Sequence, residues 1–143
     1  MINNVTFGLS SIEDIRCDID TFIEIKDGEL RFQYKISVVI NMSKGTITVI
    51  PEVQYRTSDE VVLSAFAAFI YDVKDIDDVI SLNSESRKVE FHADILPILV
   101  NSSFSGLRGI VATHSKGTSL QKYPVPLVLS KVLVSNTGIS IEQ

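Results

Sequence analysis

Apolar and polar side chains alternate along the first half of the chain. The alternation is strict over residues 30–42 (LRFQYKISVVINM) and 46–56, and looser over residues 16–25 (RCDIDTFIEI). A period of two over this length is typical of half-buried strands. Residues 26–28 contain Asp-Gly, a strong hairpin signal, so we expect antiparallel strands joined by tight turns. Because Pro51 has no N–H to donate, we expect it at an edge, a bulge or a solvent-facing position.

A fourth strand is expected over residues 61–73 (VVLSAFAAFIYDV), which are apolar on both faces. A strand of this kind is covered on both sides. We expect one face to meet the helix of its own chain and the other most simply to meet a second subunit. The segment is too short for the roughly 20 residues of a membrane span.

A long helix is expected after residue 94. Asp94 is the expected N-cap, Pro97 is tolerated in the first turn and Gly117 can end the helix. Its apolar stripe consists of Val100, Phe104, Leu107 and Val111. The pattern therefore predicts an α+β fold, with a four-stranded antiparallel sheet followed by a long helix packed on one face. The length of 143 residues fits a single domain over residues 1–143.

The rest of this helix is rich in serine and glycine. Such residues lower helix propensity but let another backbone approach closely. We therefore expect an oligomer interface, a dimer at least and a tetramer by preference, at Ser102, Ser103, Gly106 and Gly109.

Charge and composition exclude some classes of partner and some locations. The net charge is −5 and lysine and arginine do not cluster, so we expect neither nucleic acid nor an anionic membrane as partner. The start of the chain lacks the pattern of a signal peptide, and a single cysteine excludes an internal disulfide. A cytoplasmic location is the resulting expectation.

Complete catalytic or metal-binding patterns are missing from the sequence. His92 and His114 flank the helix, too far apart to share a metal through it, and Cys17 has no base beside it in the sequence. The acidic residues between Asp72 and Asp78 lack the glycine and terminal glutamate of a calcium loop. We expect no metal, no cofactor and no enzymatic activity.

The last third of the chain resembles the SecB family of protein-export chaperones. Ile95, Leu96 and Pro97 match the family's helix entry, GLRGIVATHSKGT matches its helix end, and YPVPL (residues 123–127) matches the extended segment that follows. The order of elements matches over about residues 14–134. We call residues 123–127 the hook. We expect at least two of its side chains Tyr123, Val125 and Leu127 to be buried.

The resemblance implies a cytoplasmic, oligomeric chaperone that binds unfolded or non-native polypeptide in apolar grooves, without nucleotide, for protein transport or for a dedicated partner such as an antitoxin. The chain ends at Gln143, so the family's final helix is expected to be truncated or absent. We also expect the family's acidic tail to be missing, and the loop between the first two strands to be shorter than the family's long loop, which puts handover to the Sec ATPase motor in question.

A holdase needs apolar side chains that line a surface groove, and the fourth strand and its exit are the best source of them. The candidates for polypeptide binding are Phe66, Phe69, Tyr71, Ile76 and Val79. Three functions stay open: a SecB-like holdase, a non-chaperone oligomeric scaffold of the same fold, and a small enzyme whose site forms between subunits. An alternative for the five residues is that they fill the core or a subunit contact.

Overall fold

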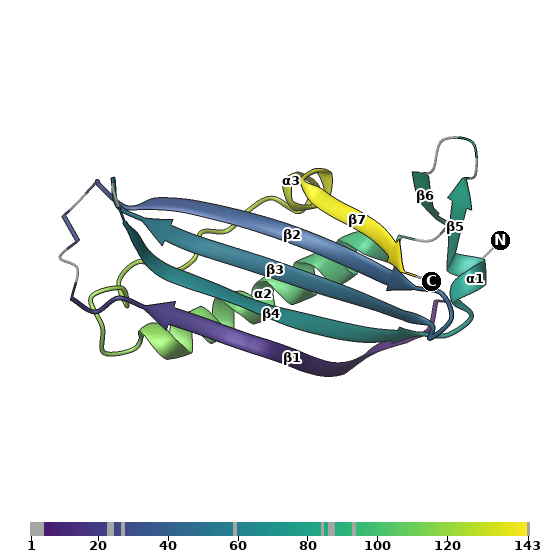
Figure 1. The fold of residues 1–143 in the computed structure, drawn as a ribbon, viewed down its shortest axis with the longest axis horizontal. Coiled ribbons are helices and arrows are strands. Elements are labelled where there is room, and N and C mark those ends of the chain that lie inside the picture. The colour runs from purple at the N-terminus through teal and green to yellow at the C-terminus, as the bar shows by residue number, and fades with distance from the viewer. Residues whose placement is uncertain are drawn as a thin grey trace.

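A computed structural model describes residues 5–22, 25–26, 28–58, 60–83, 85, 88–92 and 94–142. The protein is an α+β fold in which a five-stranded sheet carries one long helix on one face (Figure 1). The strands of this sheet are β1 (Phe7–Ile19), β2 (Arg31–Asn41), β3 (Thr46–Arg56), β4 (Val61–Val73) and β7 (Thr137–Glu142). The remaining elements are α1 (Ile76–Val79), β5 (Ile80–Asn83), β6 (Lys88–Phe91), α2 (Leu96–Ser115) and α3 (Ser130–Ser135).

The sheet has the strand order β1-β4-β3-β2-β7. The first four strands are antiparallel, as the sequence predicts, whereas β7 runs parallel to β2. This fifth strand was not expected from the sequence. Its six residues, TGISIE, are too few for a clear period of two, and its partner strand is about a hundred residues away along the chain.

The limits of β2, β3 and β4 confirm the predicted strands, but the first strand was misplaced. β1 covers Phe7–Ile19 rather than residues 16–25, and it pairs with β4 instead of forming a hairpin with β2. Its register shifts between Leu9 and Ser11 and again between Glu13 and Arg16. These irregularities break the period of two, which hid the strand. Asp27 of the expected turn lies outside the described residues.

Pro51 contradicts the expectation of an edge, a bulge or a solvent-facing position. It is buried in β3, which lies between β2 and β4. The residue opposite it on β2 is Ile36. On the β4 side the paired positions step from Val49 to Glu52, so the ladder leaves out the place where the missing N–H would have donated.

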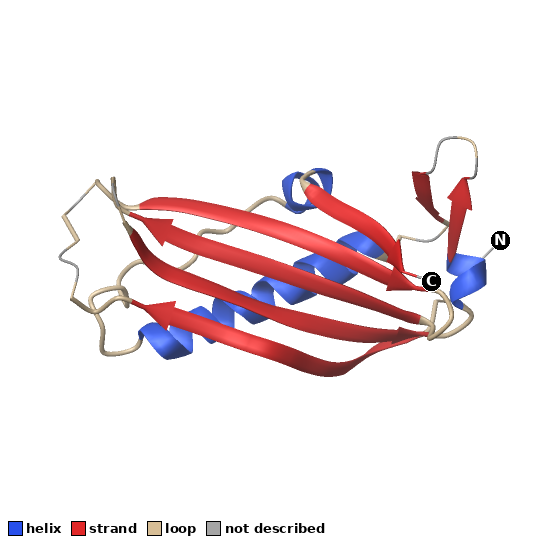
Figure 2. Cartoon of the chain, viewed as in Figure 1, coloured by secondary structure: helices blue, strands red, loops and turns tan. Residues whose placement is uncertain are grey.

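The helix α2 lies across the inner face of the sheet, as Figure 2 shows. The predicted apolar stripe is confirmed, because all of its members are buried: Val100, Phe104, Leu107 and Val111. The helix begins at Leu96 with Pro97 in its first turn, but the N-cap is Ile95 rather than Asp94. Among the described residues, the helices include none with the length and apolar character that crossing a bilayer requires.

Candidate functional site

The hook is attached to the domain through its backbone carbonyls. The Tyr55 hydroxyl donates a hydrogen bond to the carbonyl oxygen of Tyr123 (2.8 Å), and Arg108 Nε donates to that of Val125 (3.1 Å). Burial raises the pKa of Tyr55 to about 12, against the weaker opposing effect of the Arg108 charge. The phenol therefore stays a neutral donor at physiological pH.

The side chains of the hook are less buried than predicted. Only Val125 is buried, Tyr123 is half-buried, and Leu127 is 84% exposed. The expectation that at least two of the three are buried is therefore wrong. Strict alternation would place these three positions on the same side, so the hook does not keep a period of two. The carbonyl hydrogen bonds hold its backbone against the domain.

An aromatic cleft opens where the hook meets the start of β2. Its volume is about 340 Å³. The residues that line it include Leu30, Phe32, Tyr55, Lys122, Tyr123 and Pro126. Phe32 packs edge-on against Tyr55, with 5.8 Å between the ring centroids. The cleft thus combines rigid aromatic walls with a single lysine, a lining suited to apolar or aromatic side chains of a ligand.

A second, more apolar groove lies between α3 and the start of α2, beyond the C-terminal end of the hook. Its volume is about 550 Å³, and it is lined by Pro97, Leu129, Ser130, Lys131, Val134 and Ser135. Asn101 Nδ2 donates to Ser130 Oγ (2.7 Å) and ties the two helices together beside it. Leu129 is 71% exposed there.

Three large apolar side chains lie exposed in this part of the chain. They are Ile98, Leu127 and Leu129, and we call them, with the groove, the hook surface. Ile98 follows Pro97 of the groove, and Leu127 lies between the groove and the aromatic cleft in sequence. Of the three, Leu129 lines the groove itself, and an exposed apolar side chain in an apolar groove is a feature of interaction sites.

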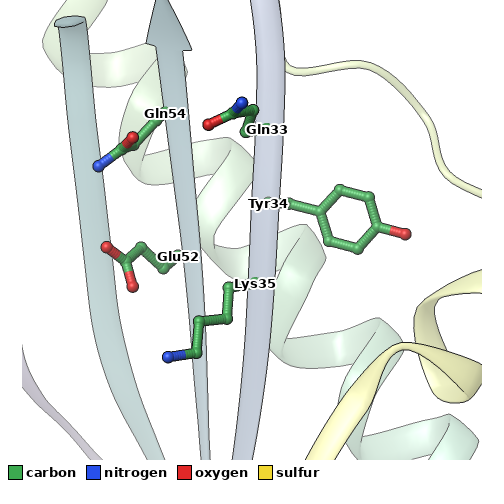
Figure 3. A pocket seen from close by; sticks show the side chains of 5 residues that line it. All are labelled: Gln33, Tyr34, Lys35, Glu52 and Gln54. Atoms are coloured by element: carbon green, nitrogen blue, oxygen red, sulfur yellow. The ribbon is translucent and has the colours of Figure 1, made fainter.

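A shallow pocket of about 190 Å³ on the sheet is polar (Figure 3). Gln33, Lys35, Glu52 and Gln54 project to one side of β2 and β3, while Tyr34 points away from them. Tyr34 instead packs edge-on against Phe104 on the inner face. The pocket contains one cation and one carboxylate in cross-strand register, an ordinary arrangement for a solvated sheet face.

Four of the five predicted polypeptide-binding residues lie in the core of the chain. Phe69, Tyr71, Ile76 and Val79 are all at most 5% exposed, so they cannot line a surface groove. Phe66 is half-buried, on the sheet face that α2 does not cover. The prediction was wrong for the four because β4 alternates: its odd positions point toward α2, and the short helix α1 folds inward.

The four predicted interface residues lie on neighbouring rows of α2 but in two different environments. Ser103 is fully buried and shares a hydrogen bond with the Tyr71 hydroxyl (2.9 Å). Gly106 faces the Phe69 ring so closely that a Cβ there would lie 2.6 Å from a ring carbon. Ser102 and Gly109 are exposed. The close approach predicted for Ser103 and Gly106 is thus made within the chain, and an interface at Ser102 and Gly109 stays a prediction.

The histidines make local contacts. His92 Nε2 is 2.7 Å from Ser81 Oγ, and His114 Nδ1 is 2.9 Å from the Ile110 carbonyl oxygen one turn earlier in α2. Burial, followed by the nearby Asp18 carboxylate, raises the pKa of the Cys17 thiol and so disfavours the reactive thiolate. Within the described ranges, His, Cys, Asp and Glu side chains form no group of three that could hold a metal ion.

The sequence interpretation missed the aromatic cleft and the groove. Phe32 and Tyr55 were assigned to the buried faces of their strands, and Leu129 follows the hook without a periodic pattern. An available signal was the run of apolar residues around two prolines, because these residues cannot all point inward from an extended segment.

No family model matches the sequence, and no curated protein matches it.

Proposed function

We propose that this protein is a SecB-like holdase that binds extended, non-native polypeptide along the hook surface and the aromatic cleft. The observation that carries the proposal is the exposure of Leu127 and Leu129 on the segment that runs from the aromatic cleft to the apolar groove. An unfolded chain offers apolar side chains at irregular spacing, and burying them on such a surface is favourable without sequence specificity.

The architecture is consistent with this proposal. Four antiparallel strands precede a long helix and an extended proline-containing segment, which is the order of elements on which the resemblance to SecB depends. The binding surface is displaced from the one expected on the sequence, from β4 to the segment that follows α2. Service in protein export, or for a single dedicated partner, belongs to the same proposal.

One observation favours the alternative, a non-chaperone scaffold of this fold. Four of the five predicted groove residues, Phe69, Tyr71, Ile76 and Val79, belong to the core instead. A scaffold would use the hook surface for one folded partner. It would not bind unrelated unfolded chains.

Binding to a fluorescently labelled, permanently unfolded polypeptide tests the proposal. We expect wild-type protein to bind in the micromolar range and to suppress aggregation of a denatured client at stoichiometric ratio. The double variant Leu127→Asp/Leu129→Asp places two carboxylates on the hook surface and should weaken binding at least about tenfold.

The matched control is Leu82→Asp. Leu82 is an exposed leucine on β5, outside both concavities. It should leave binding unchanged, and both variants should keep the wild-type circular dichroism spectrum and melting temperature. Absence of binding by the wild type, or equal binding by the Leu127→Asp/Leu129→Asp variant, would overturn the holdase proposal.

A further inference from the structure

Acidic residues are absent from one continuous part of the chain. Of the 18 acidic residues, only Glu142 follows Asp94, so residues 95–141 contain no carboxylate side chain. With histidine neutral, this stretch has a net charge of +4 in a chain whose net charge is −5. Its four basic residues are Arg108, Lys116, Lys122 and Lys131. This part of the molecule is basic because carboxylates are missing from it, not because lysines cluster there.

Three of these basic residues line concavities around the hook. Lys122 lines the aromatic cleft, and Lys131 lines the apolar groove. A third cavity, of about 270 Å³, lies between the end of α2 and the hook, and Lys116 lines it. This cavity shares Tyr123 and Pro124 with the aromatic cleft, so the two are neighbours. Each of the three concavities has one lysine and no described carboxylate in its lining.

The three lysines are available to a ligand. All are exposed, and the one ion pair among the described residues joins Arg16 to Asp18 on β1, so no described carboxylate neutralises them. Lys122 Nζ lies 5.8 Å from the centroid of the Tyr123 ring, which is a wall of the aromatic cleft. Each concavity therefore combines apolar walls with a cation that has no anionic partner.

We propose that the polypeptides held on this surface are segments that combine acidic with apolar side chains. The inference rests on the holdase function proposed above and names its class of client. Apolar side chains of such a segment fill the concavities, while neighbouring carboxylates accept charge-assisted hydrogen bonds from the three lysines. A segment that is apolar and basic instead places like charges together, with no carboxylate in the linings to receive them.

The net charge of the whole chain acts in the opposite direction, and salt screening decides between the two effects. A net charge of −5 favours basic ligands at long range. At about 0.1 M salt the Debye length is about 10 Å, so more distant carboxylates are largely screened, whereas a lysine beside the bound segment is not. The lysines in the linings therefore determine the preference at physiological salt.

Three labelled peptides test this preference. They share the same leucines and phenylalanines, with prolines at intervals that prevent regular structure, and their polar positions are all glutamate, all glutamine or all lysine. At about 0.1 M salt we expect the wild type to bind the glutamate peptide about tenfold more tightly than the glutamine peptide, and the lysine peptide most weakly. At about 1 M salt the glutamate and glutamine peptides should bind with similar affinity.

A triple variant identifies the cations responsible. Lys116→Gln/Lys122→Gln/Lys131→Gln should bind the glutamate and glutamine peptides equally, with the wild-type affinity for the glutamine peptide. The matched control is Lys35→Gln/Lys44→Gln/Lys74→Gln, which changes the net charge by the same amount at three exposed lysines outside the three concavities. This control should keep the preference for glutamate, and both variants should keep the wild-type melting temperature.

Failure of this inference and failure of the holdase proposal give different results. If the wild type binds the glutamine or the lysine peptide as tightly as the glutamate peptide, the acidic preference is overturned and the holdase proposal stands. The same conclusion follows if the control triple variant loses the preference as completely as the variant of the three lining lysines. Absence of binding by all three peptides overturns both proposals.

Discussion

Neighbouring rows of small residues on α2 lie in two different environments. On the side facing the sheet, Ser103 and Gly106 are in contact with Tyr71 and Phe69 of β4. On the side facing solvent, Ser102 is exposed, and a Cβ added at Gly109 would meet nothing within 4 Å. The same small residues are therefore required in one place and replaceable in the other.

The difference shows that the structural role of a glycine or serine in a helix depends on the residues that pack against it. Gly106 lets an aromatic ring lie directly against the helix backbone, so the sheet and the helix approach more closely than larger side chains allow. Gly109 only lowers helix propensity. Substitutions on the two sides should accordingly change stability by different amounts and in different directions.

The largest effect is expected from removing the ring that Gly106 accommodates. Phe69 is 3% exposed, and Phe69→Ala should lower the free energy of unfolding by about 3–5 kcal/mol, since it creates a cavity between β4 and α2. Urea denaturation followed by circular dichroism measures this. Phe22→Ala, at a residue 98% exposed, is the control and should leave the unfolding midpoint unchanged. A loss below about 1 kcal/mol for Phe69→Ala would show that the contact with the helix contributes little.

Gly106→Ala should have the next largest effect. The new Cβ would lie 2.6–2.7 Å from two ring carbons of Phe69, and the buried ring has little room to move. We expect a net loss of about 2 kcal/mol, because overpacking outweighs the gain in helix propensity. Thermal and urea unfolding measure the change. A more stable variant would mean that the ring can shift at low cost.

Ser103→Ala should cost about 1.5 kcal/mol, since it leaves the buried Tyr71 hydroxyl without the partner seen in the structure. The double variant Ser103→Ala/Tyr71→Phe removes both polar groups and should recover part of this loss. Equal stabilities of the single and the double variant would indicate that the hydroxyl finds another partner. Chemical denaturation of the two single variants and the double variant completes the cycle.

The attachment of the hook gives a smaller and pH-dependent effect. Tyr55→Phe removes the hydrogen bond to the Tyr123 carbonyl and should cost about 1 kcal/mol at neutral pH. The pKa of Tyr55 is raised from 10.0 to about 12 by burial, so the folded state retains a proton that the unfolded state loses. Its contribution is therefore complete below pH 10 and is lost as the pH rises toward 12.

The corresponding measurement is the urea midpoint between pH 8 and 11. Wild-type stability should fall more steeply over this range than that of Tyr55→Phe. Parallel curves for the two proteins would contradict a raised pKa at this position. As a control, Tyr34→Phe removes a tyrosine hydroxyl elsewhere and keeps the Tyr55 hydrogen bond.

Gly109→Ala is expected to have the smallest effect, with the opposite sign. The position is exposed and has room for a methyl group, so the variant should gain about 0.5–1 kcal/mol from helix propensity. Compared with Gly106→Ala, it makes the same chemical change one turn away in the same helix. If Gly109→Ala destabilises the protein, or dissociates an oligomer in light scattering, the solvent-facing side of α2 is an interface after all.

The sequence alone determined the elements whose local pattern is strong. Residues 30–42, 46–56 and 61–73 alternate or are uniformly apolar, and each forms a strand with nearly the predicted limits. The helical stripe from Val100 to Val111 likewise predicted which face of α2 is buried. These features follow from the periodicity of apolar side chains along a single element. A short stretch of sequence contains that whole pattern.

Only the tertiary structure decided which elements meet. β7 is a strand because β2 offers it an edge, and β1 pairs with β4 although the chain passes directly from β1 to β2. Pro51 is tolerated inside the sheet because the ladder to β4 is interrupted beside it. Phe69 and Tyr71 are core residues rather than groove residues because Gly106 and Ser103 face them from a helix more than thirty positions later. Contacts over such separations have no local periodic signature, so they become visible only when the chain is folded.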